Sequence, residues 1–157
     1  QKTAYEIYQC DWSSDVCSSD LAGARAHLAR RVVVLGAAST GTTTLAHDLA
    51  DRYGVPWVPE YGRSWVRTRP GGFAPPWHSS EFELVAHAQA RSEDEAVRRT
   101  PRPLLVCDTD TLAINVWHQR YVGARSARLE ALAAERVPAL YLLTSRSEEH
   151  TSELQSH

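Results

Sequence analysis

The chain has 157 residues, with 17 basic and 19 acidic side chains that give a formal net charge of −2. This balance is too mild to indicate a nucleic-acid partner or a membrane surface. The sequence shows no apolar run long enough to span a bilayer and no secretory signal peptide. We therefore expect neither a membrane protein nor a secreted one.

Both ends of the chain resemble translated sequencing adapters. One DNA strand encodes residues 146–156, and its reverse complement encodes residues 11–21. We therefore interpret residues 1–21 and 146–157 as adapter-derived and leave them out of the fold prediction. Between them stand 15 arginines, 12 acidic residues and no lysine. Cys107 is then the single cysteine, which offers no disulfide framework or metal-ligand spacing and suits a reducing cytoplasm.

The first predicted elements alternate between strand and helix. Residues 31–35 form a continuous β-branched run, which is typical of a strand buried on both faces of a parallel sheet. A helix over residues 43–53 follows and ends at Gly54. Residues 55–62 predict a short second strand, weakened by two prolines. Residues 67–80 hold too much proline and glycine for a regular element, and we expect a surface loop with a functional role.

The second half of the chain repeats this alternation. A helix is predicted from Ser79 or Ser80 to about Arg99, with Ser80 and Glu83 in the spacing of a capping box. A buried strand over residues 103–110 follows. The remaining predicted elements are helices over 111–121 and 126–136 and a strand over 139–145. This order predicts an α/β protein with a parallel sheet. Together with the phosphate-loop pattern described next, it indicates a three-layer sandwich of the P-loop NTPase type that is truncated at its C-terminus.

The stretch between the first strand and the first helix resembles a phosphate-binding loop. Its glycines have the spacing of the G-x-x-x-x-G-K-[ST] pattern, and hydroxyl residues open the helix. An ordinary glycine-rich turn is the alternative. Thr42 stands where the lysine is expected, so either an arginine supplies the charge, which could be Arg63 or one beyond the truncation, or Mg²⁺ carries more of it. We predict that the loop binds ATP and that Thr43 also contacts Mg²⁺; the ATP-binding residues are Gly36, Ser39, Thr40, Gly41, Thr42, Thr43 and Thr44.

Acidic residues follow two of the predicted strands. Asp108 and Asp110 end the strand over residues 103–110, where ligands bind in open α/β sheets. We predict catalytic roles for both, with Asp108 also serving the metal, whereas Asp110 could equally cap the next helix. Glu60, Tyr61 and Arg63 end the second strand and are predicted to bind substrate, with a solvated turn as the alternative. Other residues are interpreted as structural: Trp57, Trp65, Trp77, Trp117, Cys107 and His118.

Three motifs in this order resemble the ribosylnicotinamide kinase domain of NadR-type bifunctional proteins. They are "VVVLGAASTGTTTLA", "PEYGR" and "LLVCDTD", the last followed by "VWHQRYVG". The resemblance implies a partial kinase domain over residues 31–145, and residues 22–30 would end an upstream nicotinamide-nucleotide adenylyltransferase domain. It also implies a cytoplasmic enzyme that uses ATP and Mg²⁺ to phosphorylate the 5′-hydroxyl of nicotinamide riboside, which is a step of NAD salvage. Nucleic acid and membranes are not expected partners.

Two other functions fit the same residues. The chain could be a P-loop kinase for another small nucleoside or metabolite, or a regulatory module that binds ATP without transferring phosphate. The missing lysine favours the sensing module, while the paired acids at a strand end favour the enzyme. Kinase activity is expected of the parent protein, and the sequence leaves open whether this shortened chain retains it.

Overall fold

The computed structural model describes residues 28–100 and 102–145. The adapter interpretation of residues 1–21 and 146–157 lies outside this part of the chain. So do residues 22–27 of the segment assigned to an upstream domain. Within the described residues, no helix is both long and apolar enough to cross a membrane.

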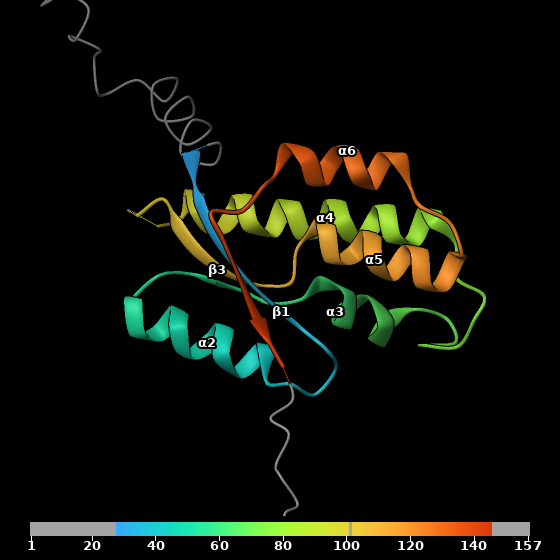
Figure 1. Ribbon diagram of the computed structural model, residues 1–157, viewed down its shortest axis with the longest axis horizontal. Coiled ribbons are helices and arrows are strands. Elements are labelled where there is room, and N and C mark those ends of the chain that lie inside the picture. The colour runs from blue at the N-terminus through green and yellow to red at the C-terminus, as the bar shows by residue number, and fades with distance from the viewer. Residues whose placement is uncertain (1–27, 101, 146–157) are drawn as a thin grey trace, which may run out of the picture.

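The described part of the chain forms a four-stranded sheet in which every neighbouring pair is parallel (Figure 1). The strand order is β2-β3-β1-β4. Val32 of the central strand lies opposite Val106 on one side and Leu140 on the other. This arrangement confirms the predicted α/β class. The strands are β1 (Arg30–Gly36), β2 (Trp57–Val58), β3 (Leu104–Asp108) and β4 (Leu140–Thr144).

Helices cover both faces of this sheet, which gives three layers. On one face, α2 packs Ala46 against Val34 and Val106. On the other face, Val97 of α4 packs against Leu105. Helices α5 and α6 lie beside α4, and α2 stands on the opposite side of the strands in Figure 1. The helices are α2 (Thr42–Tyr53), α3 (Tyr61–Thr68), α4 (Ser79–Arg98), α5 (Thr111–Val122) and α6 (Ala127–Glu135).

The second strand and the helix after it differ from the prediction. The strand is only two residues long, since Pro56 and Pro59 on either side cannot donate to a ladder. Residues 61 and 62 begin α3, which the sequence did not reveal. This helix is only eight residues long, and Gly62 in its first turn and Pro70 just after its end are signals of a turn rather than of a helix.

The start of α4 corrects the predicted capping box. His78, not a serine, is the N-cap, and its backbone N–H donates to Glu81 Oε2 at 2.9 Å. Glu83 instead accepts from Arg128 at 3.0 Å. The capping carboxylate is therefore Glu81, because the helix begins two residues earlier than the Ser80 and Glu83 spacing requires.

A charged cluster beside the sheet fixes α4 against β1. Glu93, which is 2% exposed, accepts from Arg31 Nε at 2.9 Å and from Arg136 Nη2 at 3.0 Å. Asp94 Oδ1 binds the same two guanidinium groups at 3.2 and 2.7 Å. Two carboxylates thus balance two arginines that are largely removed from water. The cluster joins the central strand, α4 and the residue after α6.

We predict that Glu93→Ala lowers the free energy of unfolding by about 3 kcal/mol, because it leaves a buried cluster with excess positive charge. Urea denaturation measures this change. Glu95→Ala, on the same helix, removes a carboxylate that is 57% exposed and pairs with Arg99 alone among the described residues. It should change stability by less than about 0.5 kcal/mol. Equal losses in the two variants would contradict the assignment.

Candidate functional site

The loop between β1 and α2 has the backbone of an anion-binding turn. Ser39 and Gly41 have positive φ angles of 67° and 85°, and turns of this kind converge backbone N–H groups on an anion. The first turn of α2 then begins at Thr42, and no side chain caps it. The N–H groups of this turn have no partners within the helix, and they lie at the positive end of its dipole. The loop is therefore suited to phosphate oxygens.

Gly36 and Thr144 fix the base of this loop. A Cβ atom on Gly36 would lie 2.0 Å from Thr144 Oγ1 and 2.5 Å from Thr40 Oγ1, so only glycine fits. Thr40 Oγ1 donates to the Ala37 carbonyl at 2.7 Å and lies 2.6 Å from Thr144 Oγ1. The loop is thus tied to the end of β4. Thr144 was not identified from the sequence.

Asp108 connects the phosphate loop to α3. Its Oδ2 accepts from Thr43 Oγ1 at 2.6 Å and lies 3.9 Å from Arg63 Nη2. Arg63 Nε in turn donates to Glu60 Oε2 at 2.6 Å. Asp108 is 3% exposed, so its carboxylate works in a partly desolvated setting. Thr43 and Arg63, which were predicted from two separate motifs, therefore meet at the carboxylate of a third motif.

The Thr43 hydroxyl and the Asp108 carboxylate fit a magnesium ion. Both are hard oxygen ligands, and they already lie within hydrogen-bond distance of each other. The described residues contain no cluster of three or more histidine, cysteine or acidic ligands. Two protein oxygens agree with Mg²⁺, which keeps several waters and takes its other ligands from substrate phosphates.

Asp110 acts as a helix cap in this structure. Its Oδ1 accepts from the backbone N–H of Ala113 at 2.9 Å, and its Oδ2 accepts from the Tyr141 hydroxyl at 2.6 Å. Burial and the Asp110 carboxylate raise the pKa of Tyr141. Asp110 does not line the cavity described below. The geometry thus shows the capping role, and the catalytic role stays a prediction.

Thr109 separates the two acids by a strained backbone. Its φ of 89° is unusual for a β-branched residue, whose Cβ crowds the backbone in this region. Its N–H donates to the Val34 carbonyl at 3.3 Å, which holds the strained turn against β1. Such strain is commonly found at functional sites. In this structure, the strained residue lies between Asp108, which lines the cavity, and Asp110, which does not.

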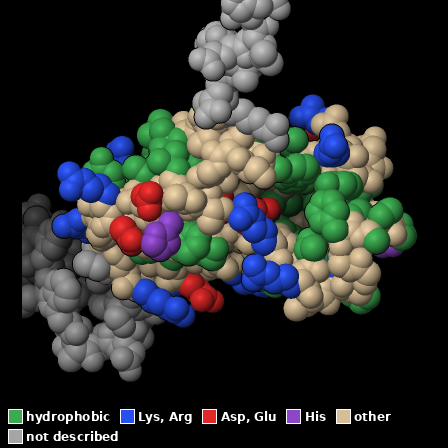
Figure 2. Space-filling view, turned by 90° about the horizontal axis from the view of Figure 1, so that it is seen from below, with side chains coloured by type: hydrophobic (Ala, Val, Ile, Leu, Met, Phe, Trp, Pro, Cys, Tyr) green, Lys and Arg blue, Asp and Glu red, His purple; other side chains and the backbone are tan. Residues whose placement is uncertain are grey.

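A cavity of about 540 Å³ extends from the phosphate loop to α5. At one end it is lined by Ser39 and Thr42, and next to them by Glu60, Arg63 and Asp108. On the face shown in Figure 2, basic and acidic side chains lie together beside a group of apolar ones. The other end is lined by aromatic side chains, which are Trp65, Phe73, Trp77, Phe82, Trp117 and Tyr121.

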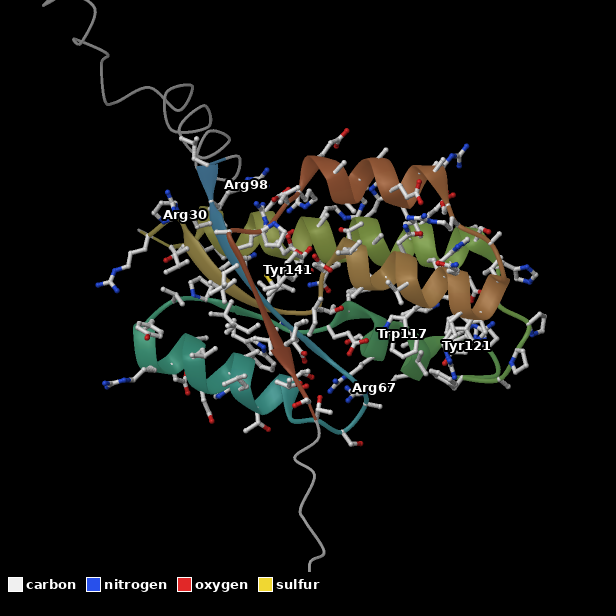
Figure 3. The ribbon with its side chains drawn as sticks, viewed as in Figure 1. Arg30, Arg67, Arg98, Trp117, Tyr121 and Tyr141 are labelled. Atoms are coloured by element: carbon white, nitrogen blue, oxygen red, sulfur yellow. The ribbon has the colours of Figure 1, made fainter. Side chains whose placement is uncertain are left out.

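The aromatic end is built from ring contacts between distant segments. Tyr121 lies at its centre, with ring centroids 5.9 Å from Trp117, 5.6 Å from Trp77 and 5.5 Å from Phe73. Trp117 and Tyr121 project from α5 toward the loop before α4 in Figure 3. Trp117 is 38% exposed, so part of its surface remains open. Three of the four tryptophans interpreted as packing residues therefore line the cavity.

Arg69 holds the proline- and glycine-rich loop over this end of the cavity. Its Nη1 donates to the carbonyls of Gly72 at 2.9 Å and Ala74 at 2.6 Å. Its Nε donates to Glu81 Oε1 at 2.5 Å, and this bond lowers the pKa of Glu81. The guanidinium also lies 4.1 Å from the centre of the Trp77 ring. The predicted surface loop is thus an ordered wall of the cavity.

The other predicted site residues are placed as follows. Tyr61 packs against the buried cluster of α4, α5 and α6, and its N–H donates to Gln89 Oε1 at 2.9 Å. It does not line the cavity, so its substrate-binding role stays a prediction. Gly41 is the residue before α2, and Thr44 lies in the first turn of that helix. His118 binds the Ala124 carbonyl and Ser79, which agrees with a structural role.

Comparison with known proteins identifies a matching family and two similar proteins. A family model described as an AAA domain matches residues 31–155. The trifunctional NAD biosynthesis/regulator proteins NadR of Escherichia coli (strain K12) and Salmonella typhimurium (strain LT2) are each 29% identical over 106 residues, which is 68% of this chain and 26% of theirs. The chain therefore spans about a quarter of the length of these relatives.

One solved structure supports the fold. The crystal structure of NadR protein in complex with NR matches with a TM-score of 0.63 and 21% identity. The match covers 78% of this chain and 35% of that one. The architecture is therefore a P-loop NTPase-like fold, as predicted, and the resemblance to NadR-type proteins has independent support.

We predict that Gly36→Ala weakens the binding of ATP with Mg²⁺ at least ten-fold, because the added methyl group displaces the loop from the end of β4. Isothermal titration calorimetry measures the affinity. A circular dichroism melt establishes that the variant is folded. An unchanged dissociation constant in a folded variant would show that the loop does not form the phosphate site.

Proposed function

The chain belongs to the AAA domain family, and from its site and its NadR relatives we propose that it is the part of a larger protein that phosphorylates nicotinamide riboside with ATP to give the mononucleotide. The observation that carries this proposal is the contact of Asp108 with both Thr43 and Arg63. It places a carboxylate between a phosphate loop and a cavity large enough for a nucleoside. A related NadR protein forms a complex with NR, which supports the same substrate here.

The loop end of the cavity is suited to the triphosphate of ATP. The uncapped start of α2 and the turn at Ser39 and Gly41 offer backbone N–H groups to phosphate oxygens. Thr43 and Asp108 would hold Mg²⁺. When bound, this ion neutralises charge on the β- and γ-phosphates.

The aromatic end is suited to a flat, positively charged ring. The faces of tryptophan and tyrosine attract cations, and nicotinamide riboside carries a permanent positive charge on its pyridinium ring. Trp117 and Tyr121 are stacked with an interplanar angle of 19°. Glu60 lies between this end and the phosphate loop, where its carboxylate could accept hydrogen bonds from the ribose hydroxyls.

Asp108 is positioned to assist the transfer. In the proposed step, the acceptor hydroxyl oxygen forms a bond to the γ-phosphorus, and the bond from that phosphorus to the bridging oxygen of ADP breaks. The hydroxyl proton passes to the Asp108 carboxylate, and ADP leaves. The low exposure of Asp108 keeps bulk water from competing for this proton.

One structural feature favours a second candidate, a module that binds ATP without transferring phosphate. Thr42 lines the cavity at the position where phosphate loops carry a lysine. That lysine normally contributes to charge stabilisation in the transition state.

We also propose that the parent protein acts in the cytoplasm and carries an upstream adenylyltransferase domain, as the NadR resemblance suggests.

We predict that the chain phosphorylates nicotinamide riboside at least ten-fold more efficiently than adenosine, cytidine or uridine, in terms of kcat/KM. The cationic ring should gain from the aromatic end, whereas neutral bases should gain less. A coupled assay of ADP release measures the rates. Equal turnover of all four nucleosides would indicate a kinase of broader specificity, and ADP release with none of them would favour the sensing module.

We predict that Asp108→Asn lowers kcat by at least a hundred-fold while ATP affinity changes less than ten-fold, since the amide cannot accept the proton. Paired measurements of transfer rate and ATP binding test this. Asp48→Asn, an exposed residue on α2, serves as the control and should retain the parent rate. Full activity in Asp108→Asn would remove this residue from catalysis.

A further inference from the structure

The phosphate loop lacks the positively charged side chain that usually offsets the charge of the β- and γ-phosphates. The pattern G-x-x-x-x-G-K-[ST] places a lysine beside the β- and γ-phosphates, and this chain has Thr42 there. Lys2 is the only lysine in the sequence. Glu60 and Asp108 line the cavity, so a triphosphate entering it would meet two carboxylates as well. A positive side chain from elsewhere in the fold would offset this charge together with Mg²⁺.

Among the described residues that line the cavity, Arg63 is the only basic one. It lies in the first turn of α3, and its Nη2 is 3.9 Å from Asp108 Oδ2. The same oxygen accepts from the Thr43 hydroxyl at 2.6 Å. One carboxylate oxygen thus separates the guanidinium from the helix start that would bind the phosphates.

The side chain of Arg63 is held without being buried. It is 53% exposed, and its Nε donates to Glu60 Oε2 at 2.6 Å. Glu60 is the residue before α3 and restrains the guanidinium at the rim of the cavity. Because about half of the side chain is exposed, the Nη groups have room to turn toward a phosphate, which arginine binds in bidentate geometry.

We propose that Arg63 supplies from α3 the positive charge that a lysine supplies from the loop in the usual pattern, and that Glu60 keeps it in reach of the phosphates. The inference rests on the proposed function in one respect, which is that the cavity binds ATP. It concerns the β- and γ-phosphates and is independent of the identity of the acceptor nucleoside.

Arg67 is the rival for this role. It lies one helical turn after Arg63 on α3 and is labelled in Figure 3. It does not line the cavity. The contact with Asp108 therefore distinguishes Arg63 from the other arginine on this helix.

The test is a charge-relocation experiment on the affinity for ATP with Mg²⁺, measured by calorimetry. Arg63→Ala should weaken binding about ten- to hundred-fold, the range for losing hydrogen bonds to a charged group. Adding Thr42→Lys to Arg63→Ala should restore most of the loss, because it returns a cation to the loop. Thr42→Lys alone should improve affinity by a smaller factor than it does in the Arg63→Ala background.

Two comparisons separate a phosphate contact from a structural role. Binding of AMP, which lacks the β- and γ-phosphates, should change less than two-fold in Arg63→Ala. Arg67→Ala and Arg120→Ala each remove one arginine that does not line the cavity and should leave ATP affinity within two-fold of the parent chain. Arg120 lies on α5 and controls for the change in net charge.

The outcomes distinguish the inference from the function on which it rests. If the unsubstituted chain binds no ATP at millimolar Mg²⁺, the proposed function fails before Arg63 is tested. If the unsubstituted chain binds ATP and the Arg63→Ala variant binds it equally well, only the role of Arg63 is overturned. That role is also overturned if Thr42→Lys gives no rescue, if AMP and ATP lose affinity alike, or if Arg67→Ala is the damaging variant.

Discussion

The hydrogen bond between Thr43 and Asp108 is the contact on which the site depends. It joins the helix that follows β1 to the end of β3, two segments 65 residues apart in sequence. Because β1 and β3 are parallel neighbours, with Val34 opposite Asp108, their carboxyl ends meet at one edge of the sheet. The phosphate loop and the acidic strand end are thereby brought together by register alone. Arg63 and Glu60 join them from the segment that follows β2.

The two ends of the central strand β1 differ: one end is held by buried ion pairs, and the other end faces a cavity. The charged cluster of Arg31, Glu93, Asp94 and Arg136 lies at the amino end of β1 and fixes α4 to the sheet. At the carboxyl end, Arg63 and Glu60 are 53% and 27% exposed and line a cavity together with the buried Asp108. Buried ion pairs are costly to break, so the scaffold resists distortion where no ligand binds. The exposed charges stand where a ligand could use them.

Much of this arrangement could be predicted from local sequence patterns. The buried β-branched run and the glycine spacing predicted β1, the loop and α2 to within one residue. Helix α3 was missed because it is only eight residues long and is bounded by Pro59 and Pro70, which signal turns. Asp110 was ambiguous, since an acid before a helix has the same local pattern as a cap and as a catalytic group. Thr144 and the aromatic end arise from register and tertiary packing, which no local pattern encodes.

The hydrogen bonds by which Arg69 holds the proline- and glycine-rich loop have a consequence for which residues of the loop can change. Its acceptors within the loop are main-chain carbonyls, those of Gly72, Ala74 and Pro76, which are present whatever side chains the loop carries. The identities of Phe73 and the residues around it can therefore change without releasing the loop from α4. The aromatic end of the cavity could therefore change in evolution while the residues of the phosphate loop stay the same.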